Sequence, residues 1–467
     1  MTTQWTTKEI VAATHGLASG NWVATSVSID TRTLQPGALF VALHGSQMDG
    51  HAHVADAIAK GAVGALVSKP VLGVDPKHLV MVADVEVALQ QLGVAGRERS
   101  KAKFIGVTGS VGKTGAKEML AVALGSVGSV YATKGNLNNH LGVPLSLANL
   151  PRDVDYAVIE MGMNHPGEIS PLSHMAKPHV SLITTVAAVH IEYFENVEAI
   201  ADEKAAIFDG MGRSGVAVIN ADNEHFARVK KHAEAKGLDR VLSFGTGKKA
   251  LCRMLEYRIE ETHSRIEAVI AGTSITYTLG TIGKHWALAS VAVLGVVDAL
   301  GGDLAKAAAE LAYFTEPKGR GRITQLSLKG GNLRLVDDCY NASPVSMVGA
   351  IEKIAEMRDA SPEPTRTVVV LGDMLELGEH AFDMHVGLLP ALVNNQMDIV
   401  FAAGKFMESL YDALPEAMRG AYKPTSRELA PVVVSALRAR DLVLVKGSRG
   451  SRMDMVVQAI EENADAL

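Results

Sequence analysis

A glycine-rich turn between an apolar strand and a helix-forming segment constrains this 467-residue chain more than any other feature. The turn reads T-G-S-V-G-K-T at residues 108–114; apolar residues 104–107 precede it, and the helix-forming segment 116–124 follows it. Backbone N–H groups of such a turn and the positive end of the next helix bind phosphate groups. The lysine adds positive charge, and the threonine hydroxyl can bind Mg²⁺. This order of elements predicts a site for ATP or GTP.

The composition is typical of a large globular enzyme. The length corresponds to about three domains, and 48% hydrophobic with 21% charged residues leave little room for long disordered segments. The formal charge of −6 argues against nucleic acid as the main partner. Only Cys252 and Cys339 are present, so a reducing compartment fits better than a disulfide framework.

Two further features concern the location of the chain. Its first residues lack a basic region followed by an apolar stretch, so we expect no export signal. The most apolar long stretch, residues 286–300, is too short to cross a bilayer and contains Asp298, which predicts a buried helix. We therefore expect a cytoplasmic protein without a membrane span, and a monomer by default.

Apolar strands that alternate with helical segments predict an α/β fold in three blocks, residues 1–100, 101–316 and 317–467. The turn- and charge-rich segment 317–322 marks the second boundary. The expected strands are 26–29, 39–43, 65–67 and 79–82 in the first block, 156–160, 180–184 and 215–220 in the second, and 334–337, 367–371, 399–403 and 442–445 in the third. The expected helices include 8–14, 54–60, one ending near 357 and one near 382–394.

Polar residues follow two apolar strands of the second block. Glu160 ends one strand and His190 follows the next. Open parallel sheets bind ligands at the carboxyl ends of their strands, and a carboxylate there can hold a metal ion. Acids and histidines also occur at strand ends without any function. The pattern alone therefore leaves open whether Glu160 and His190 bind a ligand or are ordinary strand-end residues. At Lys204 the pattern alone indicates a solvated lysine on a helix.

Several segments together resemble the Mur ligase family, ATP-dependent enzymes that form amide bonds in the peptide of the bacterial cell wall. They are the turn at 108–114, G-N-L-N-N-H-L-G-V-P at 135–144, V-I-E-M-G-M-N-H-P-G-E at 158–168, A-D-N at 221–223 and V-D-D-C-Y-N-A-S-P at 336–344. Within these and in L-G-D-M-L-E-L-G-E at 371–379 and K-G-S-R at 446–449, the chain resembles the branch that adds D-alanyl-D-alanine to UDP-N-acetylmuramoyl-tripeptide. The resemblance extends from residues 30–32 to 446–449.

The resemblance implies three domains: an N-terminal domain that binds the UDP-sugar, a central P-loop ATPase-like domain with a parallel sheet, and a Rossmann-like C-terminal domain. It implies that ATP phosphorylates the substrate carboxylate, that the dipeptide amine attacks the acyl phosphate, and that UDP-muramoyl-pentapeptide results. Because residues of the second and third blocks must meet, we expect the domains to close during turnover.

The resemblance also implies roles for single residues. Lys113, Glu160, His190 and Lys204 would be catalytic, and magnesium would be held by Thr114, Glu160, His190 and Lys204 as a carbamate. The ATP site would comprise Gly109, Ser110, Gly112, Lys113, Thr114, Asn139, Arg320 and Asp338. The UDP-substrate site would comprise Ser28, Asp30, Thr31, Arg32, Gly50 and His51. The dipeptide site would comprise Met374, Glu376, Leu377, Lys446, Ser448 and Arg449.

The chain departs from the family pattern at a few positions. Val111 and Gly115 replace polar residues of the phosphate loop and its helix, and Ser343 replaces an asparagine. In G-K-H-W-A-L-A-S at 283–290, Trp286 and Ser290 replace two asparagines, the first of which meets adenine in the family. Two interpretations stay open: Trp286 stacks on the base, or other residues recognise it.

Other functions share some of these features. A P-loop kinase would use the same loop, and its product would keep the phosphate. A regulatory nucleotide switch would bind ATP or GTP without a substrate. A sister ligase that adds a diamino acid, or a ligase that extends folate with glutamate, would share most of the chain.

Overall fold

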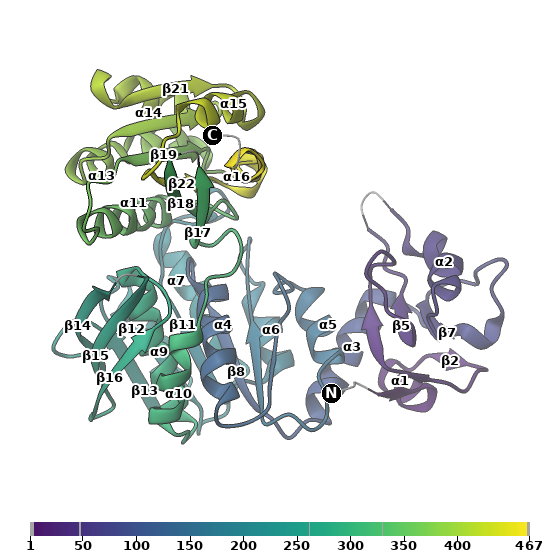
Figure 1. The fold of residues 1–467 in the computed structure, drawn as a ribbon. Helices are drawn as coiled ribbons and strands as arrows, with labels where there is room; N and C mark the ends of the chain where they lie inside the picture. Colours follow the sequence, from purple (N-terminus) through teal and green to yellow (C-terminus); the bar gives the residue numbers. More distant parts are fainter. Residues whose placement is uncertain (1–3, 46–47, 261, 329, 465–467) are drawn as a thin grey trace.

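The computed structural model describes residues 4–45, 48–260, 262–328 and 330–464, which form three α/β blocks (Figure 1). The first three residues of the N-terminal segment, where we expect no export signal, lie outside this part. In Figure 1 the central sheet lies between the N-terminal block, in purple, and the C-terminal block, in green to yellow. None of the helices described there is long and apolar enough to cross a membrane.

The N-terminal block contains a small, mostly parallel sheet. Its strands are β2 (Leu17–Ala18), β4 (Ser26–Ser28), β5 (Ala38–Val41), β6 (Gly64–Val67) and β7 (Leu79–Met81), in the order β2-β7-β6-β5-β4. Strands β1 (Trp5–Thr6) and β3 (Val23–Ala24) form a separate pair, and the helices are α1 (Thr7–Thr14), α2 (Val54–Ala59) and α3 (Val85–Glu98). The four strands and two helices expected here are confirmed, with ends that differ by a few residues.

The central block is built on a nine-stranded sheet. Its parallel strands are β8 (Lys103–Thr108), β9 (Val130–Ala132), β10 (Tyr156–Glu160), β11 (Val180–Ile183), β12 (Val216–Asn220) and β13 (Arg240–Gly245). Strand β8 lies between β10 and β11, so the phosphate loop leaves the middle of the sheet beside the ends of both neighbours. The expected strands 156–160, 180–184 and 215–220 are confirmed.

Two layers of helices cover this sheet. One contains α4 (Lys113–Gly125), α9 (Lys284–Ala299) and α10 (Leu304–Glu310), and the other contains α5 (Gly142–Ala148), α6 (Ile169–Ala176), α7 (Val197–Ala205) and α8 (Phe226–Ala235). The buried helix expected at 286–300 is α9. The sheet continues into antiparallel strands β14 (Cys252–Glu260), β15 (His263–Ile270) and β16 (Thr273–Leu279), which the sequence interpretation missed.

The C-terminal block has a six-stranded sheet in the order β17-β18-β22-β19-β20-β21. The strands are β17 (Arg322–Leu328), β18 (Gly331–Asp338), β19 (Thr367–Gly372), β20 (Ile399–Ala403), β21 (Arg419–Lys423) and β22 (Leu442–Lys446). Helices α11 (Pro344–Asp359), α12 (Ala381–Val386), α13 (Leu389–Asn394) and α14 (Met407–Ala413) lie on one face, and α15 (Ser426–Ala436) and α16 (Asp454–Asn463) on the other. The single helix expected near 382–394 is wrong, because the chain forms α12 and α13 there.

The N-terminal block is packed tightly against the central block. Helix α3 lies so close to α5 that a Cβ on Gly96 would lie 2.2 Å from the Leu147 carbonyl oxygen. The Trp5 indole N–H donates to the Ala148 carbonyl at 2.8 Å. Leu145 and Ala148 of α5 therefore belong to the same apolar cluster as the core of the N-terminal block.

We expect Gly96→Ala to lower the free energy of unfolding by about 1–3 kcal/mol, because a methyl group at a filled contact forces the two helices apart. Denaturant unfolding measures this. Gly125→Ala, at an exposed glycine with no neighbour within 4 Å of the added carbon, is the matched control and should not destabilise the protein. An equal loss in both variants would contradict this account of the α3–α5 contact.

Candidate active site

The phosphate loop connects β8 to α4 and depends on two glycines with positive φ. Gly109 has φ 147° and Gly112 has φ 82°. A Cβ on Gly109 would lie 1.9 Å from the Thr184 hydroxyl oxygen, at the end of the neighbouring strand β11. Only glycine therefore allows the loop to pass this close to β11, and the backbone N–H groups of the first turn of α4 are left facing the cleft.

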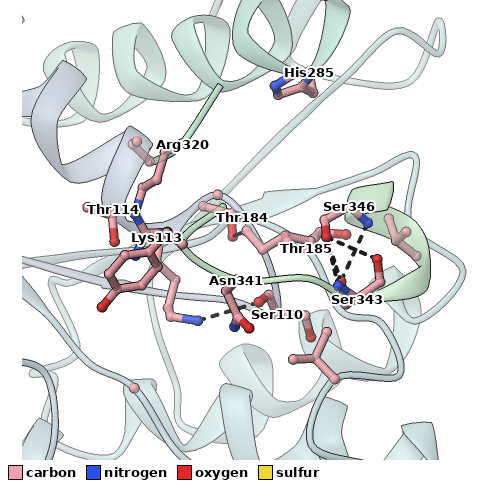
Figure 2. Close-up of a pocket in the computed structure, with 18 of the residues that line it drawn as sticks. Ser110, Lys113, Thr114, Thr184, Thr185, His285, Arg320, Asn341, Ser343 and Ser346 are labelled. Carbon is pink, nitrogen blue, oxygen red and sulfur yellow. Dashed lines mark hydrogen bonds between the residues drawn. The ribbon is translucent and has the colours of Figure 1, made fainter. Parts of the chain in front are cut away.

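Side chains of the loop fix its shape. The Ser110 hydroxyl donates to the Ala187 carbonyl and accepts from the Ala187 N–H, both at 3.0 Å. The Lys113 ammonium donates to the Gly109 carbonyl at 2.6 Å and to the Ser110 carbonyl at 3.5 Å, so it folds back over the loop. Figure 2 shows the bond to Ser110. Burial lowers the pKa of Lys113 to about 8. A phosphate group would give this buried cation a stronger partner than a neutral carbonyl.

Glu160 lies directly beside the loop and is almost fully buried, with 1% of its surface exposed. One carboxylate oxygen accepts from the Thr114 hydroxyl at 3.2 Å and from the Asn138 side-chain amide at 2.7 Å. The other oxygen is buried and has no hydrogen-bond partner among the described residues. A hydroxyl and a carboxylate with an unused buried oxygen form a hard oxygen donor set, which suits Mg²⁺.

Lys204 is buried in α7, with 2% of its surface exposed. The solvated lysine that the pattern alone indicates is therefore wrong. Burial, together with the nearby charge of Lys113, lowers the pKa of Lys204 well below its usual range. A lowered pKa makes the neutral, nucleophilic form of this amine easier to reach than in an exposed lysine.

His190 faces the C-terminal block. Its imidazole Nδ1 forms a hydrogen bond with the Glu376 carboxylate, which joins the central and C-terminal blocks. Both residues have a left-handed backbone, with φ 59° and 62°, which costs of order 1 kcal/mol or more each. Among the residues that the structure describes, no three His, Cys, Asp or Glu side chains are grouped as metal ligands. His190 is thus paired with Glu376 in this arrangement of the blocks.

A cavity of about 780 Å³ lies between the phosphate loop and the C-terminal block (Figure 2). Many of the residues expected to bind ATP or metal line it: Ser110, Gly112, Lys113, Thr114, Asn139, Glu160, His190, Arg320 and Asp338. Lys446 lines it as well. Gly109 and Lys204 are not among the residues that line it. The cavity is therefore large enough for a nucleotide and is formed by two blocks.

The C-terminal wall of the cavity is strongly polar. The Arg320 guanidinium carbon lies 4.0 Å from the centre of the Tyr340 ring. The Lys446 ammonium donates to the Asp338 carboxylate at 2.7 Å and to the Asn341 carbonyl at 3.1 Å. Asp338, which we expect at the nucleotide, and Lys446, which we expect at the dipeptide, thus form an ion pair.

The other residues expected at the dipeptide lie outside the cavity lining. Met374 and Leu377 are buried in the core of the C-terminal block, so their side chains are not available to a ligand. Ser448 is buried as well, and its hydroxyl accepts from the Leu375 N–H at 3.0 Å. Arg449 is exposed. The backbone around Met374 and Leu377 is the part that could contact a peptide.

The residues expected at the UDP-sugar lie together at the strand ends of the N-terminal sheet. Arg32 is highly exposed and ion-paired with Asp30 at 2.7 Å, and the Asp30 carbonyl accepts from the Ser28 hydroxyl at 3.1 Å. His51 is buried and hydrogen-bonded to the Asp49 carboxylate at 2.6 Å. Thr31 and Gly50 complete this group, which does not line the cavity.

The sequence interpretation missed two polar side chains that shape the site. Asn138 lies in the segment 135–144 that resembles the family, and only the structure reveals its hydrogen bond to Glu160. The Lys353 ammonium, buried in α11, donates to the Glu316 carboxylate at 3.0 Å and to the Gly321 carbonyl at 2.9 Å, which pins the segment between the two blocks. Each contact joins residues far apart in the sequence, so no local pattern signals it.

Gly115 and Trp286, two departures from the family pattern, are in direct contact. The Trp286 ring lies over the first turn of α4, where a Cβ on Gly115 would lie 2.0 Å from the indole Cζ3. Trp286 is only 6% exposed, and its ring centre lies 5.5 Å from that of Phe314. The indole therefore fills the space that a side chain at position 115 would take, and little of its face is free for stacking on a base.

Comparisons with known proteins identify the family of this chain. Residues 23–97 match the Mur ligase family catalytic domain, residues 107–297 the Mur ligase middle domain, and residues 319–449 the Mur ligase glutamate ligase domain. The UDP-N-acetylmuramoyl-tripeptide–D-alanyl-D-alanine ligase of Rickettsia prowazekii is 34% identical over 97% of this chain and 99% of its own length. The chain belongs to the Mur ligase family. It is an ATP-dependent ligase with the three-domain Mur ligase fold.

Further relatives agree with this assignment. The ligase of the same name from Escherichia coli is 33% identical and covers 94% of each chain. A crystal structure of MurF from Acinetobacter baumannii superposes with a TM-score of 0.85, at 28% identity over 98% of this chain and 99% of that one. The MurF ligase of Thermotoga maritima in complex with ADP superposes with a TM-score of 0.78, at 26% identity over 94% and 97% of the two chains.

We expect Gly115→Thr to lower the free energy of unfolding by about 1–3 kcal/mol, because the new side chain collides with the indole. Trp286→Asn should also destabilise this Mur ligase, through the cavity it leaves. The double variant, which has the residues usual in the family, should be more stable than the sum of the two losses predicts.

Denaturant unfolding of all four proteins measures this coupling. Gly125→Thr, at an exposed glycine at the end of the same helix, is the control and should change stability by less than about 0.5 kcal/mol. Strictly additive losses would mean that residues 115 and 286 do not depend on each other.

Proposed function

We propose that this chain joins D-alanyl-D-alanine to UDP-N-acetylmuramoyl-tripeptide with the energy of ATP, and so makes the UDP-muramoyl-pentapeptide of peptidoglycan synthesis. The observation that carries the proposal is the cavity in which the phosphate loop of the central block faces Arg320, Asp338 and Lys446 of the C-terminal block. Full-length relatives that bear the name of this activity support the choice of substrates.

ATP would bind with its phosphates on the loop. The N–H groups of Gly112 and of the first turn of α4 would donate to the phosphate oxygens, and Lys113 would leave the Gly109 carbonyl for the phosphates. The Ser110 N–H donates to the Thr185 carbonyl at 2.8 Å, so Ser110 would shape the loop beside the phosphates. Asn139, Arg320 and Asp338 would contact the nucleotide from the opposite walls of the cavity. The buried Trp286 favours the interpretation in which other residues recognise the base.

Thr114 and Glu160 would hold Mg²⁺, and His190 would join as a further ligand after leaving Glu376. When bound, magnesium offsets the repulsion between the anionic nucleotide and the anionic substrate. The unused buried oxygen of Glu160 supports this assignment.

Lys204 would carry a carbamate. Its neutral amine would attack carbon dioxide, form an N–C bond and release one proton, which leaves a negatively charged carbamate in place of the buried amine. The lowered pKa of Lys204 and the positive charge of Lys113 nearby both favour this reaction. The negative group would support the magnesium site.

The reaction would proceed in two steps. A carboxylate oxygen of the tripeptide attacks the γ-phosphorus of ATP, the bond to the bridging oxygen breaks, and ADP leaves. The neutral amine of the dipeptide then attacks the acyl carbon, a tetrahedral intermediate forms, the C–O bond to phosphate breaks, and the nitrogen loses a proton. Lys113 would neutralise charge on the transferred phosphoryl group throughout.

The two outer blocks would present the substrates. Ser28, Asp30, Thr31, Arg32, Gly50 and His51 would receive the UDP-sugar. Glu376, Lys446 and Arg449 would bind the charged ends of the dipeptide, with the backbone near Met374, Leu377 and Ser448 beside it. The N-terminal group does not line the cavity, and Glu376 is tied to His190, so we propose that the domains close around the substrates. We also propose that the protein is a monomer and that it works in the cytoplasm. The domain boundaries would lie near residues 100 and 316.

Phosphate release tests the function. The purified protein should release phosphate and form equal amounts of amide product only when ATP, UDP-N-acetylmuramoyl-tripeptide and D-alanyl-D-alanine are all present. Single amino acids, including diamino acids and glutamate, should not replace the dipeptide. A phosphorylated product without free phosphate would indicate a kinase, and nucleotide binding without turnover would indicate a regulatory switch.

Carbon-13 NMR tests the carbamate. With ¹³C-labelled bicarbonate, the protein should show a carbamate resonance that disappears in Lys204→Arg, and that variant should lose at least about tenfold in kcat. Lys134→Arg, at an exposed lysine, is the control and should keep both the resonance and the activity. A wild-type spectrum from Lys204→Arg would remove Lys204 from the site.

A further inference from the structure

Lys117 is a fully buried cation that none of the steps above uses. It lies on α4, one helical turn after Lys113, and its side chain is 0% exposed. Its ammonium donates to the Thr133 carbonyl at 2.6 Å and to the Gly135 carbonyl at 3.3 Å. Burying a lysine costs several kcal/mol unless opposite charges and hydrogen bonds offset the loss of water. The position of its partners therefore indicates what the residue does.

The nearest buried negative charge is Glu160. The Lys117 ammonium lies 3.9 Å from the carboxylate oxygen of Glu160 that has no hydrogen-bond partner. Its other anionic partner, Glu118 at 2.9 Å, is 42% exposed and so is screened by water. Glu160 is 1% exposed, so the attraction between Lys117 and Glu160 acts with little screening.

A second route leads from Lys117 to Glu160 through the turn that follows β9. The carbonyls that Lys117 binds belong to residues 133 and 135, and the same turn carries Asn138, whose amide donates to the other oxygen of Glu160 at 2.7 Å. The Asn138 carbonyl also accepts from the Gly162 N–H at 2.7 Å, just beyond the end of β10. Lys117 thus places a positive charge beside Glu160. It also holds the turn whose Asn138 side chain orients the Glu160 carboxylate.

We propose that Lys117 is a positioning residue of the ligase reaction, which holds the Glu160 carboxylate in the orientation that the active site needs. The inference rests on the proposed function, because it gives Glu160 its role. The sequence signal is weak, since Lys117 looks like any helical lysine. A purely structural lysine would bind the two carbonyls equally well without its charge mattering to Glu160.

The test compares Lys117→Met and Lys117→Gln with the wild-type protein. Glutamine keeps a hydrogen-bond donor for the two carbonyls and removes the charge. Residues that orient a metal ligand typically contribute about 10–100-fold to metal affinity or activity. With ADP present, both variants should therefore bind Mn²⁺, followed by electron paramagnetic resonance, at least about tenfold more weakly. Their kcat should fall by a similar factor, while the KM for D-alanyl-D-alanine stays unchanged.

Two further measurements separate positioning from stability. Amide hydrogen exchange in residues 133–139 should be faster in Lys117→Met than in the wild type, and Lys117→Arg should recover part of the Mn²⁺ affinity. Lys134→Met, at the exposed lysine of the same turn, is the control and should match the wild type. Wild-type Mn²⁺ binding and kcat in Lys117→Gln would overturn the proposal, even if Lys117→Met failed to fold. Absence of amide product from the wild type would instead count against the proposed function.

Discussion

The contact between the phosphate loop and the end of β11 is the constraint on which the rest of the site depends. Gly109 passes so close to Thr184 that no side chain fits, and Ser110 is held by Ala187. The loop is therefore fixed by the neighbouring strand as well as by its own sequence. Because β8 lies between β10 and β11, the same placement puts Glu160 beside the loop on the other side.

Local patterns predicted most of the buried parallel strands, but not β9, β13 and β21. Buried parallel strands such as β10 and β19 are continuous apolar runs, and their polar ends are recognisable in sequence. The antiparallel strands β14 to β16 were missed because they are half exposed and carry many charged residues. Likewise, Gly387 and Pro390 divide what looked like one helix, where turn chemistry outweighs the apolar pattern.

The site could be predicted only in part. The loop follows from the order of strand, turn and helix, whereas the pattern alone left the role of Glu160 open. The role proposed for Lys204 came from resemblance alone, since its burial cannot be read from its neighbours in sequence. Asn138, Lys117 and Lys353 act through contacts with distant segments. The contact between Gly115 and Trp286 could not be predicted either. The two departures look unrelated in sequence, but in the structure the indole occupies the space that a side chain at position 115 would need.

The ion pair between Lys446 and Asp338 has a consequence for how ligands communicate. Each partner belongs to a region expected to meet a different substrate, and the buried Lys446 and the partly exposed Asp338 now form an ion pair in the cavity wall. A ligand that bound one partner would leave the other without its counter-ion, so the binding of one ligand would change the affinity for the other by the same factor in both directions. Binding of one substrate would thus affect binding of the other through the ammonium group of Lys446.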